Sequence, residues 1–487
     1  MATRTRPPTT SGNGWADPIQ GRKNGVGGEE ITVEYVRSTK GRPPLPEGPF
    51  LVVGLARSGV AAARALKAHG QTVFGIDSGE PGGLDLLRES GIDFETSVAG
   101  VNRLDDVGTV IKSPGVPQSA DVIVEARRRG IRIMGELELG WRMFEAPFVA
   151  ITGTNGKTTT TELAAHLFRS AGRPVSAAGN VGHPVCEVAM EARSGLEVGT
   201  VVCECSSYQL EDSVEFSPEV AAFLNLGPDH LDRHGDMESY LQAKLKIFAN
   251  QGEGDVAILN ADDPAVAGSP TRASTVSFST EGSAGAAITL EGKTVMVDHE
   301  PLIDVGEMKI IGRHNVANAM AGAASALAFG LAMEEVAAGL RSFPPVPHRY
   351  EPVAEIEGVV FINDSKATNV DATLAAIESS DRSLHLILGG SRKDESFEPL
   401  AGPVGKACRG IYLTGETADE IGEALEKADI EIVRYCEDLE AAVSEAAGAA
   451  VPGEAVLLSP ACASFDQFRD YEDRGDHFRA LVEELDG

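Results

Sequence analysis

Residues 150–163 read AITGTNGKTTTTEL, and this stretch decides the fold of the middle of the chain. It follows an apolar strand, FVAIT, and opens a helix. A glycine-bearing turn at a helix N-terminus presents backbone N–H groups and the positive end of the helix dipole to phosphate oxygens. The sequence therefore predicts a nucleotide-binding loop. Its alternative reading is a Gly/Asn turn before a Thr-rich helix.

The loop is shorter than the usual phosphate loop, which has a glycine six residues before the lysine. Ile151 holds that position here, and the nearest upstream glycine, Gly153, precedes Lys157 by four residues. In a loop of this kind Lys157 would reach the β- and γ-phosphates, and the Thr158 hydroxyl would suit a Mg²⁺ ion.

Length and charge limit the classes of protein. A chain of 487 residues predicts about three domains. Its 42 basic and 73 acidic residues give a net charge of −31, which argues against nucleic acid or an anionic membrane as a partner. Six cysteines without CxxC spacing predict reduced thiols in a cytosolic protein. The longest apolar run, residues 319–333, is shorter than a membrane span and predicts a buried helix.

Short β-rich runs alternate with helical segments after residue 47, which predicts parallel βα units. Residues 1–47 are polar and rich in Gly and Pro, so we expect a flexible arm in which residues 31–36 could pair as a strand. The α/β blocks that follow are predicted at residues 48–134, 135–344 and 345–487. A hairpin is expected within the second block at 287–297.

The first block opens with VVGLARSG, residues 52–59, which resembles a dinucleotide-binding turn. Ala56 replaces the middle glycine that lets backbone approach a pyrophosphate, so bound NAD is disfavoured. A nucleotide held differently and a structural turn both remain open. Asp77 closes the second strand, where an acid that contacts a ribose or base would lie.

Several polar groups of the second block could hold metal. Glu204, in CECSSYQL, ends an apolar strand and would be either a Mg²⁺ ligand or a capping acid. The stretch NLGPDHLDRHG suggests metal or phosphate contacts, or a solvated loop. It is followed by a predicted helix with Lys244 and Lys246, and nothing local distinguishes either from a surface lysine.

Further polar groups follow predicted strands or the Pro-rich hinge, and the carboxyl ends of strands are where open α/β sheets bind ligands. These groups are Asn315, Asn318, Arg349, Asp364, Lys366, Thr368, Arg392, Lys393 and the stretch LLSPACASFDQFRDYEDRG.

Four motifs in this order, GTNGKTTT, PHRYE, NDSKATN and LLSPACASFDQF, resemble the Mur ligase family across about residues 48–487, and its D-glutamate-adding members in particular. The resemblance implies an α/β protein of three domains. These are a Rossmann-like N-terminal domain that binds the UDP substrate, a central P-loop ATPase-like domain with a mostly parallel sheet, and a Rossmann-like C-terminal domain that binds the amino acid. It also implies a cytoplasmic monomer whose partners are small molecules.

The activity implied is ATP-dependent ligation in peptidoglycan precursor synthesis. UDP-N-acetylmuramoyl-L-alanine would be activated as an acyl phosphate and captured by D-glutamate, with two Mg²⁺ ions. The resemblance assigns ATP to Gly153, Thr154, Asn155, Gly156, Lys157, Thr158, Thr159, Asn315, Asn318, Arg349, Asp364 and Lys366. It assigns the UDP substrate to Ser58, Asp77, Ser78, Asn180 and His230, and D-glutamate to Thr368, Lys393, Ser464 and Tyr471.

The same resemblance gives the metal ligands Thr158, Glu204, His230 and Lys244, and the catalytic groups Lys157, His230 and Lys244. Lys244 would act as a carbamate, because an ammonium cannot ligate a cation whereas a carbamate presents oxygens. Two alternatives stay open: another Mur-type or folylpolyglutamate-type ligase, and a nucleotide-binding relative without turnover. Lys157, Glu204, His230 and Lys244 together argue against the second, since a binder needs no second metal site.

Overall fold

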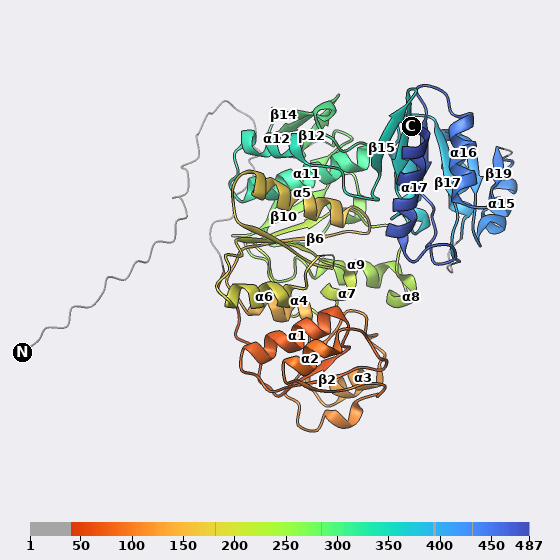
Figure 1. Cartoon of the computed structure of the whole chain (residues 1–487). Coiled ribbons are helices and arrows are strands. Elements are labelled where there is room, and N and C mark those ends of the chain that lie inside the picture. The colour runs from red at the N-terminus through yellow and green to blue at the C-terminus, as the bar shows by residue number, and fades with distance from the viewer. Residues whose placement is uncertain (1–39, 181, 284, 393–395, 431, 487) are drawn as a thin grey trace, which may run out of the picture. The chain divides into compact units, whose positions relative to one another are not determined.

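The computed structural model of the chain describes residues 40–180, 182–283, 285–392, 396–430 and 432–486. Three sheets follow one another along this chain, each flanked by helices (Figure 1). The predicted three-part α/β architecture is therefore confirmed. The first 39 residues, with the possible strand 31–36, and Lys393 lie outside the described residues.

The N-terminal sheet is parallel throughout, in the order β3-β2-β1-β4-β5. Because the order reverses at β1 and β4, the carboxyl ends of these two strands form the crevice at which such sheets bind ligands. The elements are β1 (Phe50–Val53), α1 (Arg57–Ala68), β2 (Val73–Ile76), α2 (Leu84–Glu89), β3 (Asp93–Glu95), η1 (Val101–Arg103), β4 (Thr109–Lys112), α3 (Asp121–Arg128) and β5 (Arg132–Gly135).

The central sheet has nine strands in the order β14-β13-β12-β11-β10-β9-β6-β8-β7. Its strands are parallel except for the meander β12-β13-β14, which contains the predicted hairpin. The elements are α4 (Glu136–Arg142), β6 (Phe148–Thr152), α5 (Lys157–Ser170), β7 (Val175–Gly179), α6 (Val185–Arg193), β8 (Thr200–Glu204), α7 (Ser207–Leu210), β9 (Val220–Phe223), α8 (Leu231–His234), α9 (Met237–Leu245), β10 (Val256–Asn260), α10 (Pro264–Ala267), β11 (Ser274–Ser279), β12 (Ile288–Glu291), β13 (Thr294–Val297), β14 (Glu300–Asp304), η2 (Val305–Glu307), α11 (Arg313–Ala328) and α12 (Met333–Ser342).

The C-terminal sheet has six strands in the order β15-β16-β20-β17-β18-β19, with only β15 antiparallel. The elements are β15 (Glu351–Ile356), β16 (Val359–Asn363), α13 (Val370–Ser379), β17 (Leu384–Leu388), η3 (Glu398–Leu400), α14 (Ala401–Ala407), β18 (Cys408–Leu413), α15 (Ala418–Glu426), β19 (Val433–Tyr435), α16 (Leu439–Ala449), β20 (Ala455–Leu458) and α17 (Tyr471–Asp486).

Strand β6 is buried on both of its faces, and it is apolar at every position but its last. Val149 and Ile151 pack into the core beneath α5, α11 and α12, whereas Phe148 and Ala150 pack against α4 and α6 on the opposite face (Figure 1). This alternation follows from the period of two in a strand.

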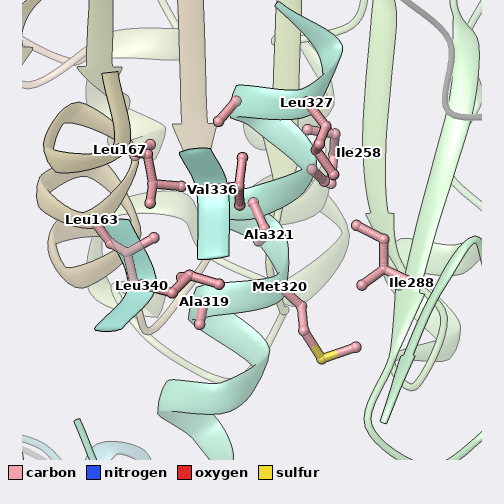
Figure 2. Packing of buried hydrophobic residues seen from close by; sticks show 14 of the residues in the cluster. Leu163, Leu167, Ile258, Ile288, Ala319, Met320, Ala321, Leu327, Val336 and Leu340 are labelled. Atoms are coloured by element: carbon pink, nitrogen blue, oxygen red, sulfur yellow. The ribbon is translucent and has the colours of Figure 1, made fainter. Parts of the chain in front are cut away.

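Helices α5 and α11 pack closely enough to fix the phosphate loop at the start of α5. A Cβ added to Gly322 of α11 would lie 2.4 Å from Leu163 Cδ2, so a larger residue there would require the Leu163 side chain to move. Figure 2 shows Leu163 and Leu167 pointing from α5 toward α12, which carries Leu340. The apolar run 319–333 thus forms the buried helix that its composition predicts, and no helix in the described part of the chain is long and apolar enough to cross a membrane.

The last residues of the segment predicted as a flexible arm contact the central block. The Arg42 guanidinium lies 3.0 Å from the Glu219 carboxylate and 4.7 Å from the ring centroid of Trp141, and its side chain is only 3% exposed. Lys40 pairs with Asp255, also in the central block. Residues 40–47 therefore contact the central block, and Arg42 supplies the cation that the buried carboxylate of Glu219 requires.

Candidate active site

The phosphate loop joins β6 to α5 as predicted. Gly156 precedes the first helical residue with φ +82°, and a Cβ there would lie 2.2 Å from Asn318 Oδ1, so the position requires glycine. Lys157 Nζ donates to the carbonyl oxygens of Gly153 and Thr154 at 2.9 and 2.7 Å. Burial lowers the pKa of Lys157 below its ordinary value. The loop thus holds a desolvated cation beside a helix N-terminus.

A pair of oxygen donors lies next to the loop. The Thr158 hydroxyl donates to Glu204 Oε2 at 2.7 Å, and the other carboxylate oxygen accepts from the Asn180 amide at 2.9 Å. Arg349 Nη2 donates to the Thr158 hydroxyl at 2.8 Å. Thr158 and Glu204 are both buried. A hydroxyl and a carboxylate at hydrogen-bonding distance, close to a phosphate loop, form a donor set that fits Mg²⁺.

The structure distinguishes Lys244, which lies in α9, from Lys246, which follows the helix. Lys244 is 1% exposed, its Nζ donates to the Gly153 carbonyl at 2.7 Å, and it lies 4.4 Å from the ring centroid of Tyr240. Burial, followed by the charge of Lys157, holds the pKa of Lys244 well below its ordinary value. Lys246 instead donates to the Glu211 carbonyl, away from the loop. Of these two lysines, Lys244 is the one that lies at the phosphate loop.

The two histidines of the DHLDRH stretch surround Tyr208. The His230 and His234 rings lie 4.9 and 5.5 Å from the Tyr208 ring, centroid to centroid, and His234 Nε2 lies 3.0 Å from the Ser207 hydroxyl. The His230 side chain is 46% exposed, and its Nε2 lies 3.4 Å from Asp229. Nothing is described for the Asp232 side chain.

Among the described residues, no three His, Cys, Asp or Glu side chains gather where they could hold a metal ion. A cation at Glu204 or at His230 would therefore need oxygens from a phosphate, a substrate or a modified lysine in addition to these side chains.

A pocket of about 500 Å³ adjoins the loop, and its lining includes Asn155, Asn315, Asn318, Asp364 and Lys366. The two carboxamides of α11 are linked, because Asn318 Nδ2 donates to Asn315 Oδ1 at 3.2 Å. Burial raises the pKa of Asp364 to about 7, although its carboxylate accepts from the Tyr350 N–H at 3.0 Å and the Ser459 hydroxyl at 2.8 Å. The pocket is lined by apolar side chains, such as Leu226 and Phe278, together with polar and charged ones, a mixture that suits a nucleotide.

The residues predicted to bind the amino acid, apart from Lys393, lie at the carboxyl end of the C-terminal sheet. Lys366 Nζ lies 3.6 Å from the ring centroid of Tyr471, whose hydroxyl donates to Glu472 at 2.8 Å. Ser464 is 2% exposed, and Thr368 is partly buried.

The residues of the N-terminal block that are predicted to bind the UDP substrate lie around the turn after β1. The Asp77 carboxylate accepts from the Leu55 N–H at 2.6 Å and from the Gly79 N–H at 2.8 Å, which ties the turn to the end of β2. Ser58 is half-buried and Ser78 exposed. A Cβ at Gly59 would lie 1.8 Å from the Gly54 carbonyl oxygen, so α1 meets the turn with no space for a side chain there.

Known domains match all three sheets of the chain. The Mur ligase MurD-like N-terminal domain matches residues 49–135, the Mur ligase middle domain 151–326, and the Mur ligase glutamate ligase domain 348–462. A relative from Pelotomaculum thermopropionicum is 40% identical over 443 residues, covering 89% of this chain and 96% of the relative. The chain belongs to the Mur ligase family.

That relative is named UDP-N-acetylmuramoylalanine--D-glutamate ligase, as is one from Acidobacterium capsulatum that is 41% identical and covers 89% of this Mur ligase and 95% of its own length. Among solved structures, the MurF ligase of Thermotoga maritima in complex with ADP has a TM-score of 0.56 at 17% identity, covering 85% of this chain and 95% of its own. The alanine ligase MurC of the same organism has a TM-score of 0.54 at 20% identity, covering 90% and 99%. These structures share the fold.

Three residues of this Mur ligase site were missed by the sequence reading. The Tyr240 hydroxyl lies 3.3 Å from the Thr154 hydroxyl, and Arg474 binds the backbone carbonyls of Ser365, Cys462 and Ala463. Arg233 reaches from α8 to the N-terminal block. Arg233 and Arg474 lie within the stretches NLGPDHLDRHG and LLSPACASFDQFRDYEDRG, and Tyr240 lies four residues before Lys244 on the same helical face.

Proposed function

We propose that this Mur ligase adds D-glutamate to UDP-N-acetylmuramoyl-L-alanine at the expense of ATP, in peptidoglycan precursor synthesis. The observation that carries the proposal is the grouping of Lys157, Lys244, Thr158 and Glu204 around the Gly153 carbonyl and the start of α5. Two lysine nitrogens and two oxygen donors gather there, which supports binding of a γ-phosphate at the start of α5. The names of the relatives support the identity of the substrates.

The reaction has two steps. An oxygen of the alanine carboxylate attacks the γ-phosphorus, the bond to the β-phosphate oxygen breaks, and ADP leaves with an acyl phosphate behind. The neutral amine of D-glutamate then attacks the acyl carbon, and the tetrahedral intermediate expels inorganic phosphate while the new nitrogen loses a proton. All the reactants are anionic, so the chain must contribute positive charge and fixed positions.

The chain's own groups divide this work. Lys157 and the N–H groups of the loop bind the phosphates, and Arg349 holds the Thr158 hydroxyl in place. Thr158 and Glu204 would hold one Mg²⁺, and His230 with Lys244 a second. When bound, such ions neutralise phosphate charge and polarise the transferring group. Asn315 and Asn318, already paired, offer amide groups to the adenine base, and Asp364 and Lys366 line the same pocket.

The state of Lys244 is part of the proposal. Burial lowers the pKa of Lys244 and so disfavours its ammonium form, and the neutral amine is the form that adds CO₂ to give a carbamate. The carbamate would carry negative charge beside Lys157, which offsets the repulsion between two ammonium groups. It would also complete a donor set that His230 cannot supply alone.

We assign the uridine nucleotide to the N-terminal sheet and D-glutamate to the C-terminal sheet. Ser58, Asp77 and Ser78 lie at the carboxyl ends of β1 and β2 and suit the uridine nucleotide, while Asn180, bonded to Glu204, would meet the muramoyl portion. Thr368, Ser464 and Tyr471 suit D-glutamate, with Lys366 providing a cation nearby. Lys393 belongs to the same proposal from sequence alone.

Phosphate release tests the proposal directly. The full chain is given ATP, Mg²⁺, UDP-N-acetylmuramoyl-L-alanine and, in separate reactions, D-glutamate, L-glutamate, L-alanine, L-lysine and meso-diaminopimelate. We expect phosphate release with D-glutamate only, and none from Lys157→Ala. Release with a different amino acid would assign another Mur-type reaction, and no release with any of them would indicate a nucleotide-binding protein without turnover.

A further inference from the structure

Arg233 joins the helix that carries His230 to the N-terminal block. Its Nη2 donates to the carbonyl oxygen of Val116 at 2.9 Å and lies 3.4 Å from that of Pro114, and it forms an ion pair with Glu211. The side chain is 14% exposed, and its guanidinium carbon lies 4.9 Å from the ring centroid of Tyr208. An arginine this buried, bound to backbone carbonyls 117 residues away, fixes the distance between two segments.

The loop that Arg233 grips, residues 113–116, lies against the turn proposed for the uridine nucleotide. Ser113 Oγ donates to the Gly54 carbonyl at 2.7 Å, and the Val116 N–H donates to the Ser113 carbonyl at 3.0 Å. A Cβ on Gly54 would lie 2.7 Å from Val116 Cγ2, so turn and loop are in full contact. Any shift of the turn on nucleotide binding must displace this loop.

At its other end Arg233 belongs to α8, a single turn of helix. The N–H groups of Arg233 and His234 both donate to the His230 carbonyl at 3.1 Å, and His230 itself has φ +54°. His230, His234 and Arg233 all contact the ring of Tyr208. The orientation of His230 therefore depends on where Arg233 is held.

We propose that Arg233 is a positioning residue that couples occupation of the uridine pocket to the orientation of His230. Nucleotide at the 54–59 turn moves loop 113–116, the two carbonyls carry Arg233 with them, and α8 turns His230 toward the reacting carboxylate. This inference rests on the proposed uridine pocket, and it adds a connection between that pocket and the chemistry.

Other side chains near Arg233 also connect the N-terminal block to the central block. Its partner Glu211 lies 3.4 Å from Lys112 Nζ, and the neighbouring Asp212 accepts from Lys112 at 2.6 Å and from Gln118 at 2.9 Å. Lys112 is fully buried. These bonds hold the two blocks together without Arg233, so removing its guanidinium should uncouple the loop from α8 without separating the blocks.

NMR of the histidine rings in the full chain can measure this coupling in the absence of ATP and metal. The protein, which has ten histidines, is labelled with ¹³C-histidine, and His230→Gln and His234→Gln assign the two rings. We expect saturating UDP to shift both ring signals in the wild type. Arg233→Met keeps an apolar side chain against Tyr208. We expect it to bind UDP with a dissociation constant within about threefold of the wild-type value. The shifts of the two ring signals should fall to at most about half of those in the wild type. Arg233→Lys should fall between them.

Turnover provides a second readout. We expect Arg233→Met to lower kcat about tenfold while KM for UDP-N-acetylmuramoyl-L-alanine stays within about threefold, and Arg233→Lys to recover part of kcat. Arg434→Met, which removes an exposed arginine on β19, is the matched control and should behave as wild type.

Shifts of the two rings that are as large in Arg233→Met as in the wild type would overturn the coupling, as would UDP binding to the wild type without shifting them. Failure of UDP to bind the wild type at all would overturn the uridine pocket too, which separates the two failures. Unchanged melting temperatures would exclude unfolding as the cause of any loss.

Discussion

The side-chain nitrogens of Lys157 and Lys244 both donate to the carbonyl oxygen of Gly153, at 2.9 and 2.7 Å. Two ammonium groups bound to one acceptor would repel each other, and burial would strengthen the repulsion because little water screens it. This repulsion disfavours the ammonium form of Lys244, and a bound phosphate group or a negative charge on Lys244 would remove it. The following predictions begin with these two lysines.

Lys157→Ala should abolish ADP formation, with a fall in kcat of at least about 1,000-fold, because the variant lacks the lysine of the loop that is proposed to bind the β- and γ-phosphates. Coupled ADP detection gives the measurement. Lys406→Ala, which removes an exposed lysine of α14, is the control and should keep full activity. Near-normal turnover in Lys157→Ala would contradict the assignment of the loop.

Lys244→Ala should be almost inactive but partly rescued by added formate or acetate, since a small carboxylate can occupy the place of a carbamate. Wild-type protein kept in ¹³C-bicarbonate should show a carbamate resonance that Lys244→Ala lacks. Full activity of the variant without any carboxylate would rule out the modification.

Glu136 should make stability depend on pH. Its Oε1 accepts from the Cys186 N–H at 2.7 Å, its Oε2 is buried without a partner among the described residues, and burial raises its pKa to about 7. A raised pKa favours the folded state while the carboxyl is protonated, and that contribution is lost as pH rises from about 4.5 through 7. The loss amounts to at most about 3 kcal/mol.

Glu136→Gln cannot ionise and should lack this loss. Unfolding midpoints of the two proteins at pH 5 and pH 8 give the test, and other buried acids such as Asp364 cancel in the comparison. We expect the variant to gain stability relative to wild type at pH 8. Equal pH dependence in both proteins would show that Glu136 stays ionised on folding.

Much of this Mur ligase follows from local sequence. The strand–helix alternation predicts the sheets, and the motif GTNGKTTT predicts Lys157 and Thr158 beside Glu204, because parallel strands end at one edge of a sheet. The choice of Lys244 over Lys246 needed the resemblance to the family, and the structure explains it by burial. Local patterns cannot show contacts between distant segments, such as Arg233 with Val116 or Arg42 with Glu219.

The contact between Arg42 and Glu219 gives a stability prediction. Glu219 is fully buried and also accepts from the Phe148 N–H at 2.8 Å, so Arg42→Ala should leave a buried carboxylate without its cation and cost about 3 kcal/mol. The double variant Arg42→Met/Glu219→Gln should recover most of this loss.

Chemical denaturation of the two single variants and the double variant measures the coupling energy. Arg88→Ala, which removes an exposed pair with Asp85 and a contact with the Phe94 ring, is the control and should cost less than about 1 kcal/mol. A loss from Arg42→Ala no larger than this control would show that residues 40–47 do not stabilise the protein.

The fate of the substrate's oxygen tests the central claim, that the muramoyl carboxylate is activated by direct transfer of phosphate within the site. UDP-N-acetylmuramoyl-L-alanine labelled with ¹⁸O in the alanine carboxylate is turned over with ATP, Mg²⁺ and D-glutamate, and the released phosphate is analysed by mass spectrometry. The acyl-phosphate route predicts one ¹⁸O atom in each phosphate. Amide product accompanied by unlabelled phosphate would contradict it.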